Sequence, residues 1–134
     1  MPKLKRVIIS KVGLDGHDRG ALVVAEFLKN SGFEVIYTGL HKTAEEIIRI
    51  AVQEDVSIIG ISILSGSHRI LISEVVKKGR ESGIDDLIVF AGGIIPIQDH
   101  DELTSIGVAK IFTPAGRLQD ISDWLSEVSR NDES

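Results

Sequence analysis

The chain has 134 residues, a length typical of one domain with a single core. Its 43% of hydrophobic and 26% of charged residues are ordinary for a globular protein and argue against intrinsic disorder. The formal net charge of −5 argues against a nucleic-acid partner, and the absence of cysteine excludes disulfides, iron–sulfur clusters and thiol nucleophiles.

The predicted elements begin close to the start of the chain. The first residues lead into a short apolar segment without the long apolar core of a signal peptide, and no apolar stretch is long enough to span a bilayer. We therefore expect a cytoplasmic protein with no membrane association. Residues 1–134 are expected to form one domain.

Five short β-branched segments predict strands that are buried on both faces of a parallel sheet. In chain order they span residues 7–9, 35–37, 58–61, 87–90 and 111–112. Longer amphipathic segments separate them, so the chain consists of five βα units. This pattern predicts a single α/β domain with a doubly wound, five-stranded parallel sheet of flavodoxin-like (Rossmann-like) order.

Apolar residues recur at helical spacing between these strands and after the last one. Thr43 and Glu46 have the spacing of a capping box, and Gly32, Gly83 and Gly107 stand where helices are expected to end. Residues 131–134 are expected to form a frayed polar tail. The predicted buried stripes are Ala44, Ile47, Ile48 and Ala51, then Ile72, Val75, Val76 and Gly79, and finally Leu118, Ile121, Leu125 and Val128.

Glycine, serine and threonine gather in the segments that follow predicted strands. These loops are expected over residues 11–20, 62–66, 92–96 and 113–116. Ligands of open α/β sheets bind outside the carboxyl ends of the strands. The sequence therefore predicts a ligand site at this edge of the sheet.

The first of these loops contains a possible metal-binding histidine. Asp15 precedes His17 by two residues, and a metal-ligating histidine usually donates its second ring N–H to a carboxylate. Gly13, Gly16 and Gly20 would let a large flat ligand approach the backbone. The alternative is an Asp-Gly turn with a solvated histidine, and these residues alone leave both interpretations open.

Three spaced motifs resemble the cobalamin-binding domain of the adenosylcobalamin-dependent mutases, most closely the methylmalonyl-CoA mutase family. The family pattern of Asp-x-His-x-x-Gly, Ser-x-Leu and Gly-Gly appears here as Asp15-Gly-His17-Asp-Arg-Gly20, Ser62-Ile-Leu64 and Gly92-Gly93. The gaps between the motifs also match. The resemblance extends over nearly the whole chain.

The resemblance implies a role for each motif. His17 would be the lower axial ligand of cobalt, Asp15 would hold its far ring nitrogen, and Lys11 would extend that hydrogen-bond chain. Ser62, Leu64 and the two glycines would accommodate the displaced nucleotide tail between the sheet and its helices. The implied cofactor-binding residues are Asp15, Gly16, His17, Asp18, Arg19, Gly20, Ser62, Leu64, Ser65, Gly66, Gly92, Gly93 and Thr113.

The last loop departs from the family pattern. Relatives usually carry a Gly-Pro-Gly-Thr-like loop after the fifth strand, whereas this chain has Thr113-Pro-Ala-Gly116. In the resemblance, this departure affects contacts to the outer part of the nucleotide tail and leaves the axial ligand unchanged. Of the other histidines, His68 is expected at the ligand end, His41 after the second strand, and His100 on an exposed helix surface.

The resemblance implies an isomerase subunit that uses adenosylcobalamin, with its cobalt, in a radical rearrangement between methylmalonyl-CoA and succinyl-CoA. A separate large subunit would bind the acyl-CoA substrate in a (β/α)8 barrel, which this chain is too short to contain. The isolated chain is therefore expected to be inactive.

Other functions remain open at the sequence level. The chain is also compatible with the small subunit of an isobutyryl-CoA or 2-hydroxyisobutyryl-CoA mutase, or with a non-catalytic corrinoid carrier or sensor. A phosphate-controlled switch is disfavoured, because Ser62 and Thr113 stand where such a switch needs an acid and a lysine. A zinc site formed by Asp15, His17 and another histidine is a further alternative.

Overall fold

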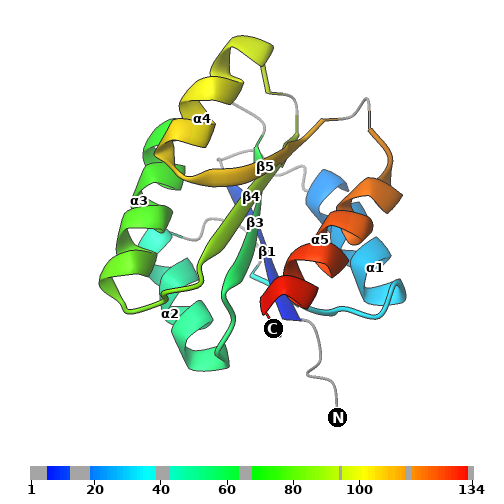
Figure 1. Ribbon diagram of the computed structural model, residues 1–134, viewed down its shortest axis with the longest axis horizontal. Coiled ribbons are helices and arrows are strands. Elements are labelled where there is room, and N and C mark those ends of the chain that lie inside the picture. Colours follow the sequence, from blue (N-terminus) through cyan, green and yellow to red (C-terminus); the bar gives the residue numbers. More distant parts are fainter. Residues whose placement is uncertain are drawn as a thin grey trace.

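The computed structural model describes residues 6–12, 19–38, 43–63, 68–93, 95–113 and 116–132. Its five strands form one parallel sheet in the order β2-β1-β3-β4-β5 (Figure 1), which confirms the predicted flavodoxin-like topology. The strands are β1 (Arg6–Val12), β2 (Glu34–Tyr37), β3 (Ile58–Ile63), β4 (Ile88–Gly93) and β5 (Val108–Phe112).

The helices cover the two faces of the sheet unequally. Figure 1 shows α1 and α5 on one face and α2, α3 and α4 on the other. A short 3-10 helix, η1 (Ile97–Asp99), precedes α4. The α-helices are α1 (Arg19–Asn30), α2 (Ala44–Glu54), α3 (His68–Glu81), α4 (His100–Ile106) and α5 (Leu118–Asp132).

Each face of the sheet has its own hydrophobic core. On one face, Ile8, Ile59 and Ile61 of the central strands pack with buried residues of α2, α3 and α4. On the other, Val7 and Ile9 pack with residues of α1 and α5. The alternation of side chains along each strand produces this division, because successive residues point to opposite faces.

The predicted helix stripes are buried, except for Leu118 and the half-buried Val128. Those of α2 and α3 are fully buried, and Ile121 and Leu125 of α5 are buried as well. Leu118 is instead 36% exposed, because it stands in the first turn of α5, beside a cleft. At α2, the Thr43 hydroxyl accepts a hydrogen bond from the Glu46 amide, and the Glu46 carboxylate accepts one from the Thr43 amide, so the predicted capping box is confirmed.

The structure corrects the boundaries of several predicted loops. Lys11, Ser62, Gly92 and Gly93 belong to strands, not to loops. Each predicted strand ended where its apolar segment ends. The hydrogen-bonded pairing with the neighbouring strand continues further, because it uses the main-chain N–H and C=O groups that each of these residues carries. The strands therefore carry these residues themselves to the carboxyl edge of the sheet.

Three further predictions need correction. The edge strands β2 and β5 are only partly buried, because each has a neighbour on one side alone. Asn131 and Asp132 belong to α5, so helix occupies part of the predicted tail. His100 is half-buried, and its Nε2 lies 3.2 Å from the carbonyl oxygen of Ile95, so it is not a freely exposed residue. Among the described residues, no helix is both long and apolar enough to cross a membrane.

Candidate functional site

A cleft of about 520 Å³ opens between the carboxyl half of the sheet and the helices α1 and α5. Its surface is mainly apolar. The sheet supplies its floor, and the two helices with the segment after β5 supply its walls. The lining residues are Ile9, Ala21, Val23, Val24, Ile61, Ser62, Phe90, Gly92, Gly93, Phe112, Thr113, Gly116, Arg117, Leu118 and Ile121.

Four residues predicted from the motifs meet in this cleft. Ser62, Gly92, Gly93 and Thr113 come from or directly follow three different strands, and all four line it. The strand register explains their proximity, since Ser62 pairs with Gly92, which in turn pairs with Phe112. On the other side of β3, the backbone of Lys11 pairs with Ser62, so Lys11 lies in the same row across the sheet.

The remaining predicted residues divide into two groups. The backbone places Arg19 and Gly20 in the first turn of α1, and His68 at the start of α3. The others lie outside the described residues. They are Asp15, Gly16, His17, Asp18, His41, Leu64, Ser65 and Gly66.

Gly92 leaves open space in the cleft. A Cβ atom built on Gly92 would have its closest contact at 3.6 Å, with the carbonyl oxygen of Phe112, which is an ordinary van der Waals distance. Gly92 does not have a positive φ, whereas Gly93 has a φ of 129° that disfavours any other residue. Protein packing therefore does not require glycine at position 92. Its lack of a side chain keeps volume free for a ligand.

An aromatic cluster lies at the floor of the cleft. The ring of Phe90 covers Gly60 so closely that a Cβ at Gly60 would lie 2.3 Å from the Cζ atom of Phe90. Phe90 also makes edge-to-face contacts with Phe112 and Trp124, with ring centroids 5.9 and 5.5 Å apart. The three rings support one another, since Phe112 and Trp124 are themselves 5.8 Å apart. Packing therefore fixes this part of the floor in place.

The polar groups inside the cleft are few. The side chain of Ser62 is half-buried, and its hydroxyl has no hydrogen-bond partner among the described residues. The same is true of the Thr113 hydroxyl. An apolar cleft with two available hydroxyls suits a mainly apolar ligand with a small number of polar atoms.

Among the described residues that line the cleft, Arg117 is the one that is charged. In the described part of the chain, the group with a shifted pKa is Arg69, which does not line the cleft; its hydrogen bond to Glu102 and the charge of that carboxylate raise the pKa of the guanidinium. Within the described residues, no group of three histidine or acidic side chains is placed to hold a metal ion.

The sequence did not predict most of the apolar residues that line this cleft. Val23 and Val24 were assigned to no site, Ile121 was predicted only as a core residue, and Phe90 was predicted only as a strand residue. The exposure of Val23, at 45%, is a tertiary property. The period-two alternation of Ile58, Gly60 and Ser62 was a usable signal, because it assigns Ser62 to the α1 and α5 face.

The chain matches the family model described as "B12 binding domain" over residues 5–118. It is 47% identical over 120 residues to the 2-hydroxyisobutanoyl-CoA mutase small subunit of Aquincola tertiaricarbonis, covering 90% of this chain and 88% of that protein. It is 35% identical over 125 residues to the pivalyl-CoA mutase small subunit of Xanthobacter autotrophicus, covering 93% and 84%. It is also 42% identical over 127 residues to the methylmalonyl-CoA mutase of Escherichia coli, covering 94% of this chain and 18% of that protein.

Solved structures agree on the fold. A cobalamin-binding protein from Desulfitobacterium hafniense superposes with a TM-score of 0.80 at 21% identity, over 94% of this chain and 60% of that one. The chemotaxis protein CheY4 of Vibrio cholerae superposes with a TM-score of 0.68 at 12% identity, over 94% and 99%. At such low identity these likenesses establish the architecture alone.

Proposed function

We propose, from the premise that this chain belongs to the B12-binding domain family, that it is the cobalamin-carrying subunit of an adenosylcobalamin-dependent acyl-CoA mutase. Its homologues include small subunits of acyl-CoA mutases and a domain of methylmalonyl-CoA mutase. The observation that carries the proposal is the apolar cleft at the carboxyl ends of the strands, where Ser62, Gly92 and Thr113 meet.

The cleft fits the nucleotide tail of cobalamin. The tail ends in a flat aromatic base, and the cleft offers an apolar floor built around Phe90 and open space above Gly92. The hydroxyls of Ser62 and Thr113 are available to hydrogen-bond polar atoms of the tail. The tail would therefore be held by burial of its apolar part, with a few hydrogen bonds to orient it.

The proposal assigns the metal-facing role to residues of the segment between β1 and α1. His17 would hold cobalt from below, and Asp15 would accept a hydrogen bond from its second ring nitrogen and so raise the basicity of the imidazole. Lys11, in the neighbouring strand position, would extend this hydrogen-bond chain. The support for these roles is the Asp15-x-His17 spacing together with the cleft beside α1.

Bound adenosylcobalamin supplies radical chemistry through its cobalt–carbon bond. The chain itself contributes binding and orientation. Burial of the tail in the cleft would fix the position of the corrin relative to the sheet edge, and a covering partner would exclude water from the reacting face. Substrate binding would belong to that partner.

We further propose that the partner is a separate large subunit with a (β/α)8 barrel that binds an acyl-CoA. Coverage supports this organisation, because the chain spans 88% and 84% of two mutase small subunits but only 18% of the E. coli methylmalonyl-CoA mutase. The motif resemblance favours methylmalonyl-CoA as substrate. The match to the 2-hydroxyisobutanoyl-CoA mutase small subunit makes 2-hydroxyisobutyryl-CoA an equal candidate. Such an assembly is expected to work in the cytoplasm.

The test replaces the proposed cobalt ligand. Wild-type chain mixed with cobalamin should give the spectrum of a cobamide that has lost its own base and gained a histidine. His17→Ala should abolish that spectrum while far-ultraviolet circular dichroism stays unchanged, because the described cores on both faces of the sheet are formed by other residues. Asp15→Asn should retain the histidine spectrum with weaker binding, since the ligand remains while its acceptor loses charge. An unchanged spectrum in His17→Ala would refute the assignment.

A further inference from the structure

The cleft has a gradient from an apolar floor to a charged mouth. Ile9, Phe90 and Ile121 are buried at its floor and wall. Arg117 stands at the other extreme, with a side chain that is 79% exposed. A ligand that fills this cleft therefore meets apolar surface at one end and a guanidinium at the other.

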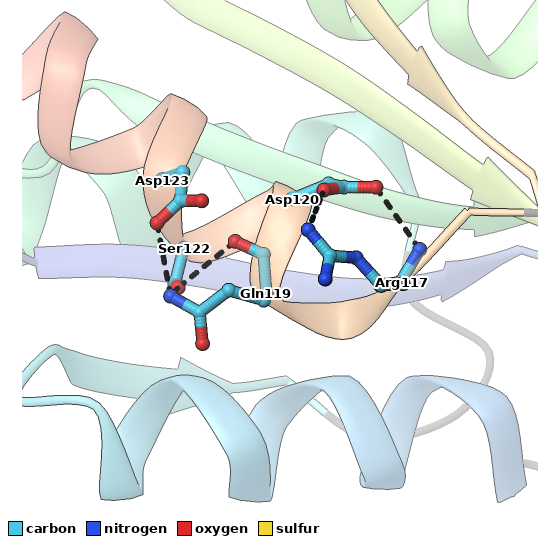
Figure 2. A network of polar contacts seen from close by, with 5 residues as sticks. All are labelled: Arg117, Gln119, Asp120, Ser122 and Asp123. Atoms are coloured by element: carbon cyan, nitrogen blue, oxygen red, sulfur yellow. Dashed lines mark hydrogen bonds and ion pairs between the residues drawn. The ribbon is translucent and has the colours of Figure 1, made fainter.

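The Arg117 side chain is held by Asp120. One carboxylate oxygen of Asp120, Oδ2, accepts a hydrogen bond of 3.0 Å from the Arg117 backbone amide, and the other, Oδ1, lies 3.5 Å from Nη2 of the guanidinium. Figure 2 shows the carboxylate reaching both groups from the first turn of α5. Asp120 therefore contacts Arg117 at two points, the backbone amide and the guanidinium.

The guanidinium retains donors for a ligand. Within the described part of the chain, the ion pair with Asp120 is the sole polar contact of its head group, so Nε and Nη1 have no protein acceptor. The neighbouring Gln119 does not compete for Asp120, because its amide donates instead to Ser122 and Asp123, as Figure 2 shows. Arg117 is therefore positioned by one carboxylate and still able to bind a second anion.

We propose that Arg117 binds the phosphodiester of the cobalamin nucleotide tail, with Asp120 as its positioning residue. This inference rests on the proposed function, because it assumes that the tail occupies the cleft. The phosphodiester links the base to the corrin, so a tail with its base at the apolar floor carries its one negative charge toward the open end. A planar guanidinium is well suited to pair with phosphate oxygens.

The charge of the whole chain gives the cation at Arg117 particular weight. With a formal net charge of −5, the protein as a whole repels anions, and none of the other described residues that line the cleft is charged. Removing Arg117 would leave the phosphate facing a net negative protein. The loss should then depend on salt, since ions in solution screen exposed charges.

The experiment measures equilibrium binding of cobalamin to the full chain by dialysis, alone and with the large subunit of an acyl-CoA mutase. Arg117→Gln should weaken cobalamin binding about fivefold, in keeping with the modest strength of an exposed ion pair. Arg117→Lys should recover part of that loss, because the charge remains while the planar fork is lost. Raising the salt from about 50 to about 300 mM should weaken binding to the wild type more than to Arg117→Gln.

Two controls isolate the phosphate. Arg49→Gln removes another exposed arginine, with a side chain that is 62% exposed, that pairs with Glu45 one turn away on α2, on the opposite face of the sheet, and should leave cobalamin binding unchanged. Cobinamide, which lacks both phosphate and base, should bind the wild type and Arg117→Gln equally. Asp120→Asn should weaken cobalamin binding to a smaller extent than Arg117→Gln.

The outcomes separate this inference from the proposed function. If wild-type chain with its partner binds cobalamin, and Arg117→Gln matches it in affinity and in salt dependence, the phosphate assignment is wrong while the cobalamin function stands. If Arg117→Gln weakens cobinamide as much as cobalamin, the arginine does not act on the phosphate. If the wild type binds no cobalamin in either setting, the proposed function itself fails.

Discussion

Gly92 is the residue whose identity the protein's own architecture explains least. Neither a positive φ nor a close neighbour requires glycine there, in contrast to Gly60, where the Phe90 ring occupies the place of a side chain. The proposed binding of the cobalamin tail would explain the difference. At Gly60 the Phe90 ring occupies the place of a side chain, whereas at Gly92 that place is open space in the cleft.

Filling that space is the prediction at this scale. Gly92→Val should weaken cobalamin binding at least tenfold, because the new methyl groups occupy the volume needed by the tail. The free energy of unfolding should change by no more than about 1 kcal/mol, since valine favours strands and a Cβ has room at this position. Equilibrium dialysis and urea unfolding measure the two effects.

A graded control supports this prediction. Gly92→Ala adds one methyl group and should give a smaller loss of affinity with no loss of stability. Equal cobalamin affinity in wild type and Gly92→Val would mean that the tail does not enter the cleft beside β4. A large loss of stability in the valine variant would instead show that packing, not a ligand, requires this glycine.

At the scale of elements, the extension of β1, β3 and β4 beyond their apolar segments creates the site. The ladder between β3 and β4 continues to Ile63 and Gly93, so Ser62 and Gly92 lie side by side on ordered backbone. Sites built on strands are held more precisely than sites on free loops. The helices α1 and α5 cover the face of the sheet that contains the cleft, whereas α2, α3 and α4 pack in the core on the other face.

The division between the faces predicts that α2 can be weakened without loss of binding. Thr43→Ala removes the hydroxyl that accepts from the Glu46 amide and should cost about 1 kcal/mol of stability. The melting temperature should fall by about 3–5 °C for a domain of this size. Cobalamin affinity at 25 °C should stay within twofold of the wild type, because the cleft lies on the opposite face.

Thr43→Ser is the matched variant, since serine retains the accepting oxygen and should keep the melting temperature within about 1 °C. Differential scanning calorimetry gives the comparison. A fall in cobalamin affinity in Thr43→Ala beyond what its lower stability explains would show that the two faces are coupled.

At the scale of the whole molecule, the proposed function divides the work between this chain and a separate large subunit. The described residues include a mainly apolar cleft of about 520 Å³ on the α1 and α5 face and a more polar hollow of about 530 Å³ between α2 and α3. The proposal assigns the first to the cofactor and places the acyl-CoA site in the large subunit. The two small-subunit homologues are similar in length to this chain.

The corresponding prediction concerns reconstitution. The purified chain with adenosylcobalamin should show no turnover, and mixing it with the large mutase chain should produce isomerisation of one acyl-CoA. The assay uses a panel of methylmalonyl-, isobutyryl-, 2-hydroxyisobutyryl- and pivalyl-CoA. Substrate choice should follow the large chain when large chains are exchanged, because the proposal places the acyl-CoA site in that chain. Turnover by the small chain alone would contradict this division.

The sequence by itself determined the topology, the buried helix stripes and the capping box of α2. These follow from hydrophobic periodicity and from local hydrogen bonds, which depend on residues a few positions apart. The family resemblance also predicted Ser62, Gly92, Gly93 and Thr113 as cofactor-binding residues, and the structure brings these four to one cleft.

Only the tertiary structure decided where the strands end, that Leu118 borders a cleft, and that His100 contacts the Ile95 carbonyl. It also placed Arg117 at the mouth of a cleft whose other described lining residues are uncharged. Each of these facts depends on partners that are distant in the chain or on the space left between packed elements. Hydrophobic periodicity indicates which residues are buried, but the shape of a cleft depends on all the elements that surround it.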